Sequence, residues 1–140
     1  MPSVYIAYRT DQSQGSEVTH NNLRARYDIG EAKVHQAMKE WAKLTEDFRE
    51  ALKNKDQDSI HELINRNYDI RESLLEISEE NKLMVRLARF TGTSAKFTGS
   101  GGAIIGTYKS EEQYQELVKN LSTNGIEVIK PQIVCNKDQK

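Results

Sequence analysis

The residues of this sequence that are best suited to chemistry lie in one glycine-rich stretch, SAKFTGSGGAIIGTY, from Ser94 to Tyr108. Lys96 and Thr98 alternate along its first half, so on a strand they would offer a cation and a hydroxyl on one face. Its centre consists of Gly99, Ser100, Gly101 and Gly102. Because glycine accepts positive φ and has no side chain, consecutive backbone N–H groups there could point at one anionic oxygen. The stretch could therefore bind a phosphate group.

The same stretch also has a purely structural interpretation. Glycines supply the positive φ of a tight hairpin turn, and a lysine and a threonine on a strand are commonly its solvent side. The glycine loops of the dinucleotide and P-loop motifs leave a strand and open a helix, whereas this loop joins two β-prone runs. This context argues against those two motifs, and the residues alone leave the hairpin turn and the anion site both open.

A second set of polar residues could bind a substrate. His20 and Arg24 stand four apart and share one face of a helix expected to begin near residue 17. A guanidinium from Arg24 or Arg26 could hold a carboxylate through two parallel hydrogen bonds. Asn67 and Arg71 continue the apolar stripe of a later helix, so both should point towards its covered side and need partners there. The alternatives are a solvated face for the first group and, for the second, contacts that tie the helix to the glycine hairpin.

Composition excludes several classes of protein and site. The 20 lysines and arginines against 21 aspartates and glutamates give a formal charge of −1, which supplies no field to attract nucleic acid or an anionic membrane. Cys135 has no partner, which excludes a disulfide scaffold and fits a reducing compartment. His35 and His61 lack companions at metal-ligand spacing, so we expect surface histidines and no metal site. With no apolar stretch of membrane-spanning length and no signal-peptide start, we expect a cytoplasmic protein.

The hydropathy pattern predicts a single α+β domain. The expected strands are Val4–Tyr8, Ser94–Thr98, Ala103–Tyr108 and Ile126–Ile129. Three consecutive helices are predicted between the first two strands and one helix before the last strand, with the expected caps at Asp56, Ser78 and Ser110. This order is that of a ferredoxin-like split β-α-β sandwich with an antiparallel four-stranded sheet and extra helices in the first crossover.

Two of these helices carry apolar stripes that predict their buried faces. The helix over residues 32–52 has apolar residues at spacings of three and four: Met38, Trp41, Phe48 and Leu52. The helix after Ser78 has a corresponding stripe of Leu83, Met84, Leu87 and Ala88. Gly92 and Gly125 are expected to end the helices that precede them.

SAKFTGSGGAIIG resembles the third conserved motif of the GHMP kinases, the galactose, homoserine, mevalonate and phosphomevalonate kinase superfamily. That pattern reads G-A-K-x-T-G-x-G-G followed by a strand, and Ser94 stands at its first glycine. LINRNYDIR, from Leu63 to Arg71, resembles the helix before the motif, and EVTHNNLRARYDIGE resembles the segment after the first strand of the C-terminal domain. The sequences of these segments are most similar to those of plant-type glucuronokinases, and the resemblance extends from Val4 to about Ile133.

The resemblance implies a GHMP kinase C-terminal domain over residues 1–135, with 136–140 as a polar tail. It implies that the motif from Lys96 to Gly102 lies near the transferred phosphoryl group of an ATP-dependent sugar kinase. The signature of the N-terminal ATP-binding domain, P-x-x-x-G-L-S-S-[ST], does not occur in this sequence. ATP and Mg²⁺ are therefore expected only in the complete kinase, and no catalytic residue is expected in this chain.

The same resemblance implies the partners of this domain. An N-terminal GHMP kinase domain, in cis or as a separate subunit, would complete the site, and the acceptor would be a sugar or a sugar acid such as glucuronate. A face normally covered by that domain would favour self-association of the chain alone. The alternative is a non-catalytic module that kept this fold and binds a sugar or another protein.

Overall fold

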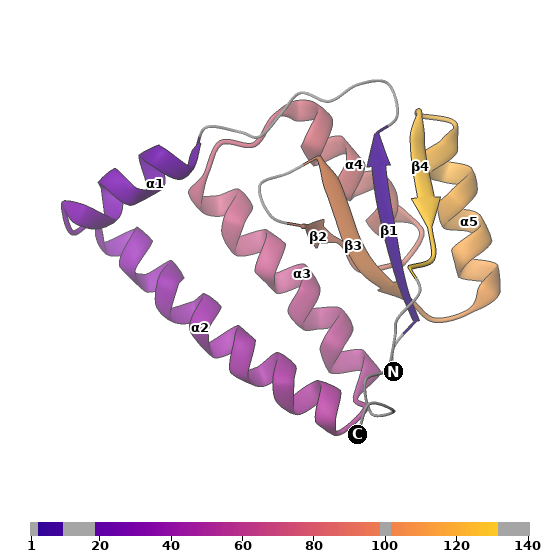
Figure 1. Ribbon diagram of the computed structural model, residues 1–140, viewed down its shortest axis with the longest axis horizontal. Coiled ribbons are helices and arrows are strands. Elements are labelled where there is room, and N and C mark those ends of the chain that lie inside the picture. The colour runs from indigo at the N-terminus through magenta and orange to yellow at the C-terminus, as the bar shows by residue number, and fades with distance from the viewer. Residues whose placement is uncertain (1–2, 10–18, 99–101, 132–140) are drawn as a thin grey trace, which may run out of the picture.

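The computed structural model describes residues 3–9, 19–98 and 102–131, with the side chains of 19–23 left aside. Four strands and five helices make up this part of the chain (Figure 1). In chain order they are β1 (Ser3–Arg9), α1 (Thr19–Asp28), α2 (Ala32–Lys53), α3 (Gln57–Leu74), α4 (Glu79–Phe90), β2 (Lys96–Phe97), β3 (Ala103–Tyr108), α5 (Glu111–Ser122) and β4 (Ile126–Ile129). Four helices, α1 to α4, therefore lie in the first crossover, one more than the three that the hydropathy pattern predicts, because the helix expected near residue 17 also forms there as α1.

The strands form one four-stranded sheet in the order β2-β3-β1-β4. Every neighbouring pair is antiparallel: Ile6 lies opposite Ile105 on β3 and opposite Ile129 on β4, and Lys96 on β2 lies opposite Ile105. The first strand in the chain is therefore in the middle of the sheet (Figure 1). This order and direction confirm the ferredoxin-like split β-α-β fold.

Alternation along the strands gives the sheet two different faces. One face is buried: Tyr5, Ala7 and Ile104 are inaccessible to solvent and pack with Met84 of α4 and Leu117 of α5. In Figure 1, α4 lies behind the strands and α5 lies beside β4. These two helices supply most of the apolar cover that the sheet needs on this face.

The other face, the open face, carries the side chains of alternate residues. Among the described residues it includes Val4, Ile6 and Tyr8 of β1, Ile105 of β3 and Ile129 of β4. Tyr8 and Ile129 are 38% and 42% exposed. The described elements therefore leave apolar side chains of this face in contact with solvent.

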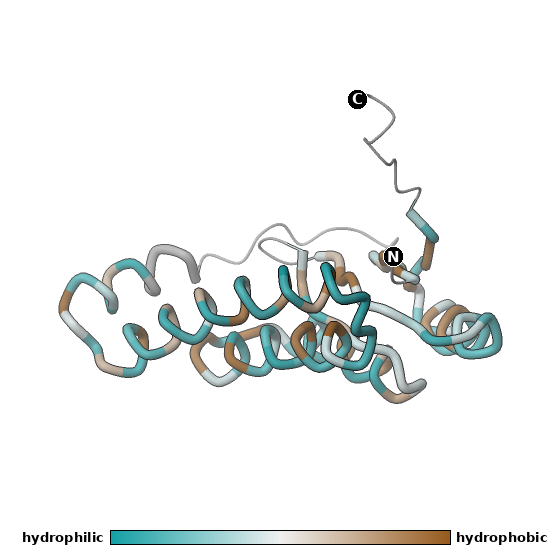
Figure 2. Tube along the Cα trace, turned by 90° about the horizontal axis from the view of Figure 1, so that it is seen from below, coloured by the Kyte–Doolittle hydropathy of each residue, from teal (hydrophilic) through white to brown (hydrophobic). Residues whose placement is uncertain are grey.

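The long helices α2 and α3 lie side by side at the flank of the sheet (Figure 1). They have apolar clusters of their own. Val34 and Ala37 of α2 pack with Ile70 and Leu74 of α3 near one end, and Ala51 packs with Ile60 and Ile64 near the other. Figure 2 shows the underlying pattern, in which hydrophobic and hydrophilic residues recur along each helix so that one side is apolar.

The capping predictions are confirmed. The side chains of Asp56, Ser78 and Ser110 accept hydrogen bonds from the backbone N–H of Ser59, Asn81 and Gln113. These bonds satisfy N–H groups that the first helical turn leaves without partners.

Two helix-face predictions and one strand boundary are wrong. Leu52 and Leu83 are 38% and 41% exposed, because the buried residues of their helices are instead Val34, Ala37 and Ala51 in α2 and Met84, Val85 and Ala88 in α4. The strand expected over Ser94–Thr98 is only Lys96–Phe97. The reason for its shortness is the pairing that Ser94 makes.

Candidate functional site

Ser94 crosses β3 at very close range. Its hydroxyl accepts a hydrogen bond from the backbone N–H of Thr107 at 2.8 Å, and its own N–H donates to the Thr107 carbonyl at 3.2 Å. The Ser94 carbonyl instead accepts the hydroxyl of buried Tyr5 at 2.6 Å. The Ser94 hydroxyl thus takes the place of a backbone carbonyl as the acceptor for the Thr107 N–H, and regular pairing of β2 with β3 begins only at Lys96.

The close approach of Ser94 to β3 depends on Gly106, whose missing side chain leaves the space that the Ser94 carbonyl group occupies. A Cβ built on Gly106 would lie 1.8 Å from the Ser94 carbonyl oxygen and 2.8 Å from Cε1 of Tyr5. Only glycine allows two backbones to approach so closely. An isolated glycine inside a strand is a known sign of close backbone approach, so the sequence did contain a signal for this contact.

Asn65 of α3 fixes the chain just before β2. Its side-chain carbonyl accepts the Ala95 backbone N–H at 3.0 Å. Arg89 of α4 joins the same region, since its guanidinium donates to the carbonyls of Asn65 and Ala95 and to the carboxylate of Asp69. Neither residue was predicted as functional, and both position the strand that carries Lys96.

We expect Asn65→Ala to destabilise the chain by about 1–3 kcal/mol, because the backbone N–H of the buried Ala95 would lose its partner. Thermal unfolding followed by circular dichroism measures the loss. Asn124→Ala is the matched control, since the Asn124 amide bonds only at the exposed end of α5. Equal melting temperatures for the two variants would contradict the role given to Asn65.

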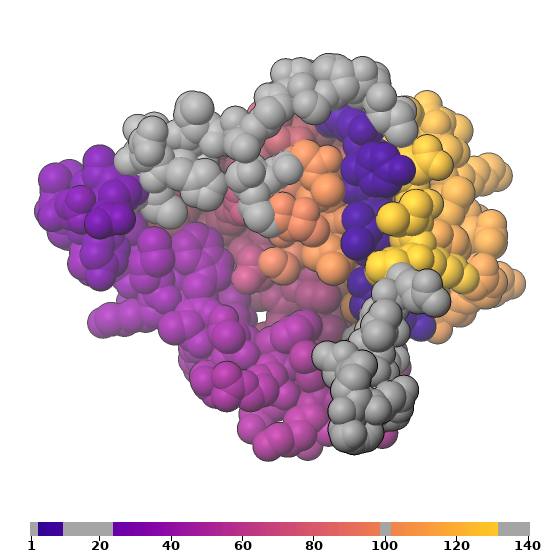
Figure 3. Space-filling model, viewed as in Figure 1, coloured from indigo at the N-terminus to yellow at the C-terminus, as the bar shows by residue number. Residues whose placement is uncertain are grey.

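Three of the predicted site residues line one cavity. Asn67 of α3, Lys96 of β2 and Thr98 contribute to a cavity of about 470 Å³ between the α2–α3 pair and the open face. In Figure 3 the magenta helices lie beside the orange and indigo strands, and a small gap is visible among the magenta atoms. The apolar part of the lining comes from Val4, Leu44, Phe48, Ile60, Leu63, Ile64 and Ile105.

Lys96 is the charged member of this lining among the described residues. Its ammonium donates to the carbonyl of Phe97 at 3.4 Å, and no described carboxylate forms an ion pair with it. Burial and, secondarily, the positive charge of Arg71 lower the pKa of Lys96. An anion placed here would relieve both effects.

Arg71 lies next to this group. Its guanidinium carbon is 5.2 Å from the centre of the Phe97 ring, on which it packs as a cation on an aromatic face. Arg71 and Lys96 therefore bring two positive charges to the same end of the glycine hairpin, which favours a negatively charged ligand there.

The tip of the hairpin lies largely outside the described residues. Gly99, Ser100 and Gly101 are not described, so the cradle predicted for them stays a prediction. Gly102 is described: its φ is +92°, and a Cβ there would meet no atom within 4 Å. Its role is consequently conformational, as either a hairpin turn or an anion loop requires.

The predicted substrate residues of α1 lie at a different contact. The side chain of His20 is outside the described part of the chain. Arg24 is exposed and pairs with Asp28 at 3.5 Å. The Arg26 guanidinium donates twice to Glu31, at 2.8 and 2.9 Å, and once to the Leu74 carbonyl at the end of α3. The donors of Arg26 thus link α1 to α3.

The two histidines whose side chains are described have ordinary structural contacts. The ring of His35 stacks on Tyr27 with centroids 4.1 Å apart, and Nε2 of His61 lies 3.4 Å from the Asn65 amide. Both are half-buried, because each packs on a neighbouring helical side chain, so the expectation of surface histidines was too simple. In the part of the chain that the structure describes, no group of three potential ligand residues could hold a metal ion.

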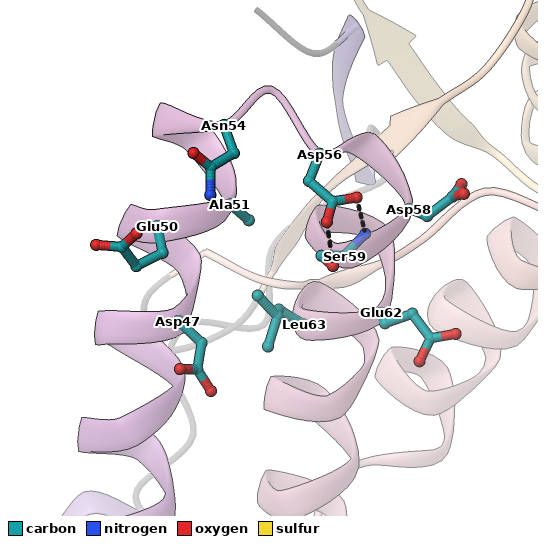
Figure 4. A pocket seen from close by; sticks show the side chains of 9 residues that line it. All are labelled: Asp47, Glu50, Ala51, Asn54, Asp56, Asp58, Ser59, Glu62 and Leu63. Carbon is teal, nitrogen blue, oxygen red and sulfur yellow. Dashed lines mark hydrogen bonds between the residues drawn. The ribbon is translucent and has the colours of Figure 1, made fainter.

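A second pocket lies at the turn between α2 and α3 and is lined by acidic side chains (Figure 4). Glu50 and Asp58 point away from one another, and the Asp56 carboxylate is engaged by the N–H and hydroxyl of Ser59 at 3.2 and 2.8 Å. These bonds lower the pKa of Asp56 and close the first turn of α3. Helix capping explains this cluster.

Comparison with known proteins decides the family. Residues 48–127 match the family described as "GHMP kinases C terminal". The chain belongs to this family. Proteins of the family use ATP and Mg²⁺, and the matched range contains α3, the Lys96 hairpin and most of the residues that line the cavity.

Two curated relatives come from Arabidopsis thaliana. Probable glucuronokinase 2 is 39% identical and Glucuronokinase 1 is 37% identical, each over 108 residues that make up 75% of this chain. The aligned region covers only 29% and 30% of those relatives. The chain therefore spans less than a third of the length of the relatives it matches.

Solved structures confirm the fold. Mevalonate kinase of L. major matches 96% of this chain with a TM-score of 0.78 and 19% identity, and the match covers 44% of that chain. Mevalonate kinase of Methanococcus jannaschii matches 96% of this chain and 40% of its own, with a TM-score of 0.72 and 21% identity. At these identities the similarity concerns the fold alone. No helix in the described part of the chain is long and apolar enough to cross a bilayer.

Proposed function

We propose that this chain is the C-terminal domain of an ATP-dependent sugar kinase that phosphorylates a sugar acid, with glucuronate as the acceptor, in the cytoplasm. The observation that carries the proposal is the 39% identity with a relative named as a glucuronokinase across three quarters of the chain. The positive charge beside the glycine hairpin supports it, because phosphoryl transfer depends on stabilising negative charge.

In this proposal the hairpin acts on the phosphoryl group being transferred. Lys96 supplies a cation whose burial strengthens its attraction to phosphate oxygens, and Thr98 adds a hydroxyl. Gly99, Ser100, Gly101 and Gly102 would present backbone N–H groups to the same charge. These are groups that hold and neutralise an anion, and no described residue is assigned as acid, base or nucleophile.

The sugar contacts are the less direct part of the proposal. Asn67 lines the cavity beside Lys96, and Arg71 lies close enough to influence the charge of that lysine. A carboxylate on the acceptor would be attracted to these two residues. For His20, Arg24 and Arg26 a sugar contact would require a change of partners, since the described arginines already bind Asp28, Glu31 and the Leu74 carbonyl.

The remaining parts of the site would come from an N-terminal GHMP kinase domain, in the same chain or as a separate subunit. The residues described here fit a phosphate group but offer no set of acids for Mg²⁺. That domain would therefore supply the metal ligands, the nucleotide loop and the catalytic acid. The open face, with Tyr8 and Ile129 partly exposed, is the surface that would receive it or, in its absence, a second copy.

A domain exchange with a plant relative tests this function. We would replace the C-terminal region of Probable glucuronokinase 2 that aligns with this chain by the chain itself. The resulting chimera should turn over ATP only when glucuronate and Mg²⁺ are present. The 140-residue chain alone should show no turnover, because most of the positioning and charge stabilisation would be missing.

Two controls make the outcome clear. The unmodified plant enzyme shows that the assay detects sugar-dependent turnover of ATP. The plant enzyme truncated before the exchanged region shows how much turnover its N-terminal part supports alone. A folded chimera that binds ATP without sugar-dependent turnover would contradict the proposal and favour a binding module of the same fold. Sugar-dependent turnover by the isolated chain would contradict the requirement for a second domain.

A further inference from the structure

The cavity between the α2–α3 pair and the open face has apolar walls that the proposed sugar kinase function does not use. Its volume of about 470 Å³ lies within the range of small-molecule sites. Leu44 and Phe48 of α2 and Leu63 and Ile64 of α3 form one wall, and Ile105 of β3 belongs to the facing wall. Most of the space is therefore bounded by aliphatic and aromatic groups.

A sugar acid does not match such walls. Each of its carbons carries a polar group, and hydroxyls placed against leucine, isoleucine and phenylalanine would lose their hydrogen bonds to water without replacement. A ligand for the whole cavity must have an apolar body. Lys96 and the amide of Asn67, which belong to the same lining, can each bind one polar end of that ligand.

We propose that the apolar part of this cavity binds a second ligand, an amphipathic monoanion with a compact alkyl or aryl body and one carboxylate, which shares the Lys96 ammonium with the proposed kinase function. The body would occupy the space between Phe48, Leu63 and Ile105, and the carboxylate would bind the Lys96 ammonium. Lys96 forms no ion pair with a described carboxylate, so the carboxylate of such a ligand would supply the partner for its ammonium group.

The position of the cavity couples this ligand to the hairpin. Lys96 and Ile105 belong both to the cavity lining and to the two strands that carry the glycine loop, and Thr98 of the lining directly follows β2. A ligand that binds Lys96 and Ile105 would act through these two strands on any anion site at the loop. The site would therefore be a regulatory one.

Octanoate is the probe, with 1-octanol and glucuronate as comparison ligands, and the test uses the 140-residue chain labelled for NMR. Octanoate should bind with a dissociation constant of about 0.1–1 mM and shift the amide signals of residues around Leu63 and Ile105. Octanol should bind about tenfold more weakly because it lacks the charge. Glucuronate should leave those apolar-wall signals in place.

Two variants separate the parts of the site. Lys96→Met should remove the preference for octanoate over octanol while octanol still binds. Thr45→Trp, at an exposed position of the lining, should fill the cavity and weaken both ligands more than tenfold without lowering the melting temperature. Thr123→Trp, exposed at the end of α5, is the matched control and should bind both ligands like the parent.

Three results would overturn the proposal. They are shifts that spread over the surface instead of gathering at the cavity, a Lys96→Met chain that keeps its preference for octanoate, and glucuronate that shifts the apolar-wall signals as octanoate does. The last result would make the cavity part of the sugar site. Because the mapping is done on the parent chain, a variant that fails to fold does not prevent a decision.

Discussion

Replacing Gly106 by alanine should destabilise the chain by about 3 kcal/mol and lower its melting temperature by about 10 °C. The added Cβ would lie 1.8 Å from the Ser94 carbonyl oxygen and 2.6 Å from the Ser94 carbonyl carbon. Both are backbone atoms, which cannot turn aside as the end of a flexible side chain could. Ser94 would have to move away from β3 and release its bonds to Thr107 and Tyr5.

Gly102→Ala is the matched control for this variant. It lies just before β3, and nothing within 4 Å would meet its Cβ, so only the positive φ opposes the substitution. That cost is about 1–2 kcal/mol. Thermal unfolding of both variants separates close approach from backbone conformation, and a Gly106→Ala chain as stable as Gly102→Ala would contradict the close crossing.

Lys96→Met in the chimeric kinase described above should lower kcat/KM by about 100-fold or more. The substitution keeps the length and the apolar stem of the side chain but removes the cation beside the glycine loop. If that cation stabilises the transferred phosphoryl group, the loss concerns the transition state, so kcat should fall more than KM rises. Steady-state kinetics with glucuronate and ATP measure this difference.

The same variant should be more stable than its parent at neutral pH. Burial and the charge of Arg71 lower the pKa of Lys96, so the folded chain releases this proton at a lower pH than the unfolded chain does. The charged ammonium therefore costs stability below the lowered pKa. Stability recovers as the pH rises from that value to the ordinary lysine range, where the unfolded chain binds more protons. Methionine removes this cost, and the melting temperature of the 140-residue chain should rise by a few degrees.

Lys53→Met is the control, because Lys53 is exposed and its ion pair among the described residues is with Glu50 on the outside of α2. It should change neither kcat/KM nor the melting temperature. A Lys96→Met chimera with near-parent turnover would show that the lysine is only part of a strand. Lower stability together with lower turnover would point to a structural role in place of a catalytic one.

Local sequence signals predicted the arrangement of elements because they depend on short-range physics. Asp56, Ser78 and Ser110 are polar residues just before helical turns, and each caps the helix that follows it. β4 has the bounds Ile126–Ile129 that its β-prone run predicts. The order of these elements was sufficient for the antiparallel sheet, since few topologies connect such a series without crossings.

Helix faces were predicted less well. Leu52 and Leu83 continue apolar stripes and yet are exposed, because a helix buries only the side that meets a neighbour. The neighbours of α4, which are α5 and the strands, are distant in sequence. The strand that begins at Lys96 was predicted too long for a similar reason: the Ser94 hydroxyl bonds to Thr107, thirteen residues away, in place of regular pairing.

The sequence by itself determined the order and caps of the elements and, through the motif from Lys96 to Gly102, the family. Only the tertiary structure placed Asn67 beside Lys96 and Ile105 in one cavity, and only it showed that Arg26 binds Glu31 and the Leu74 carbonyl. Caps and periodicity act over a few residues, so the chain carries them locally. A cavity and a close backbone crossing arise where segments distant in sequence meet, and the distances between them exist only in the folded chain.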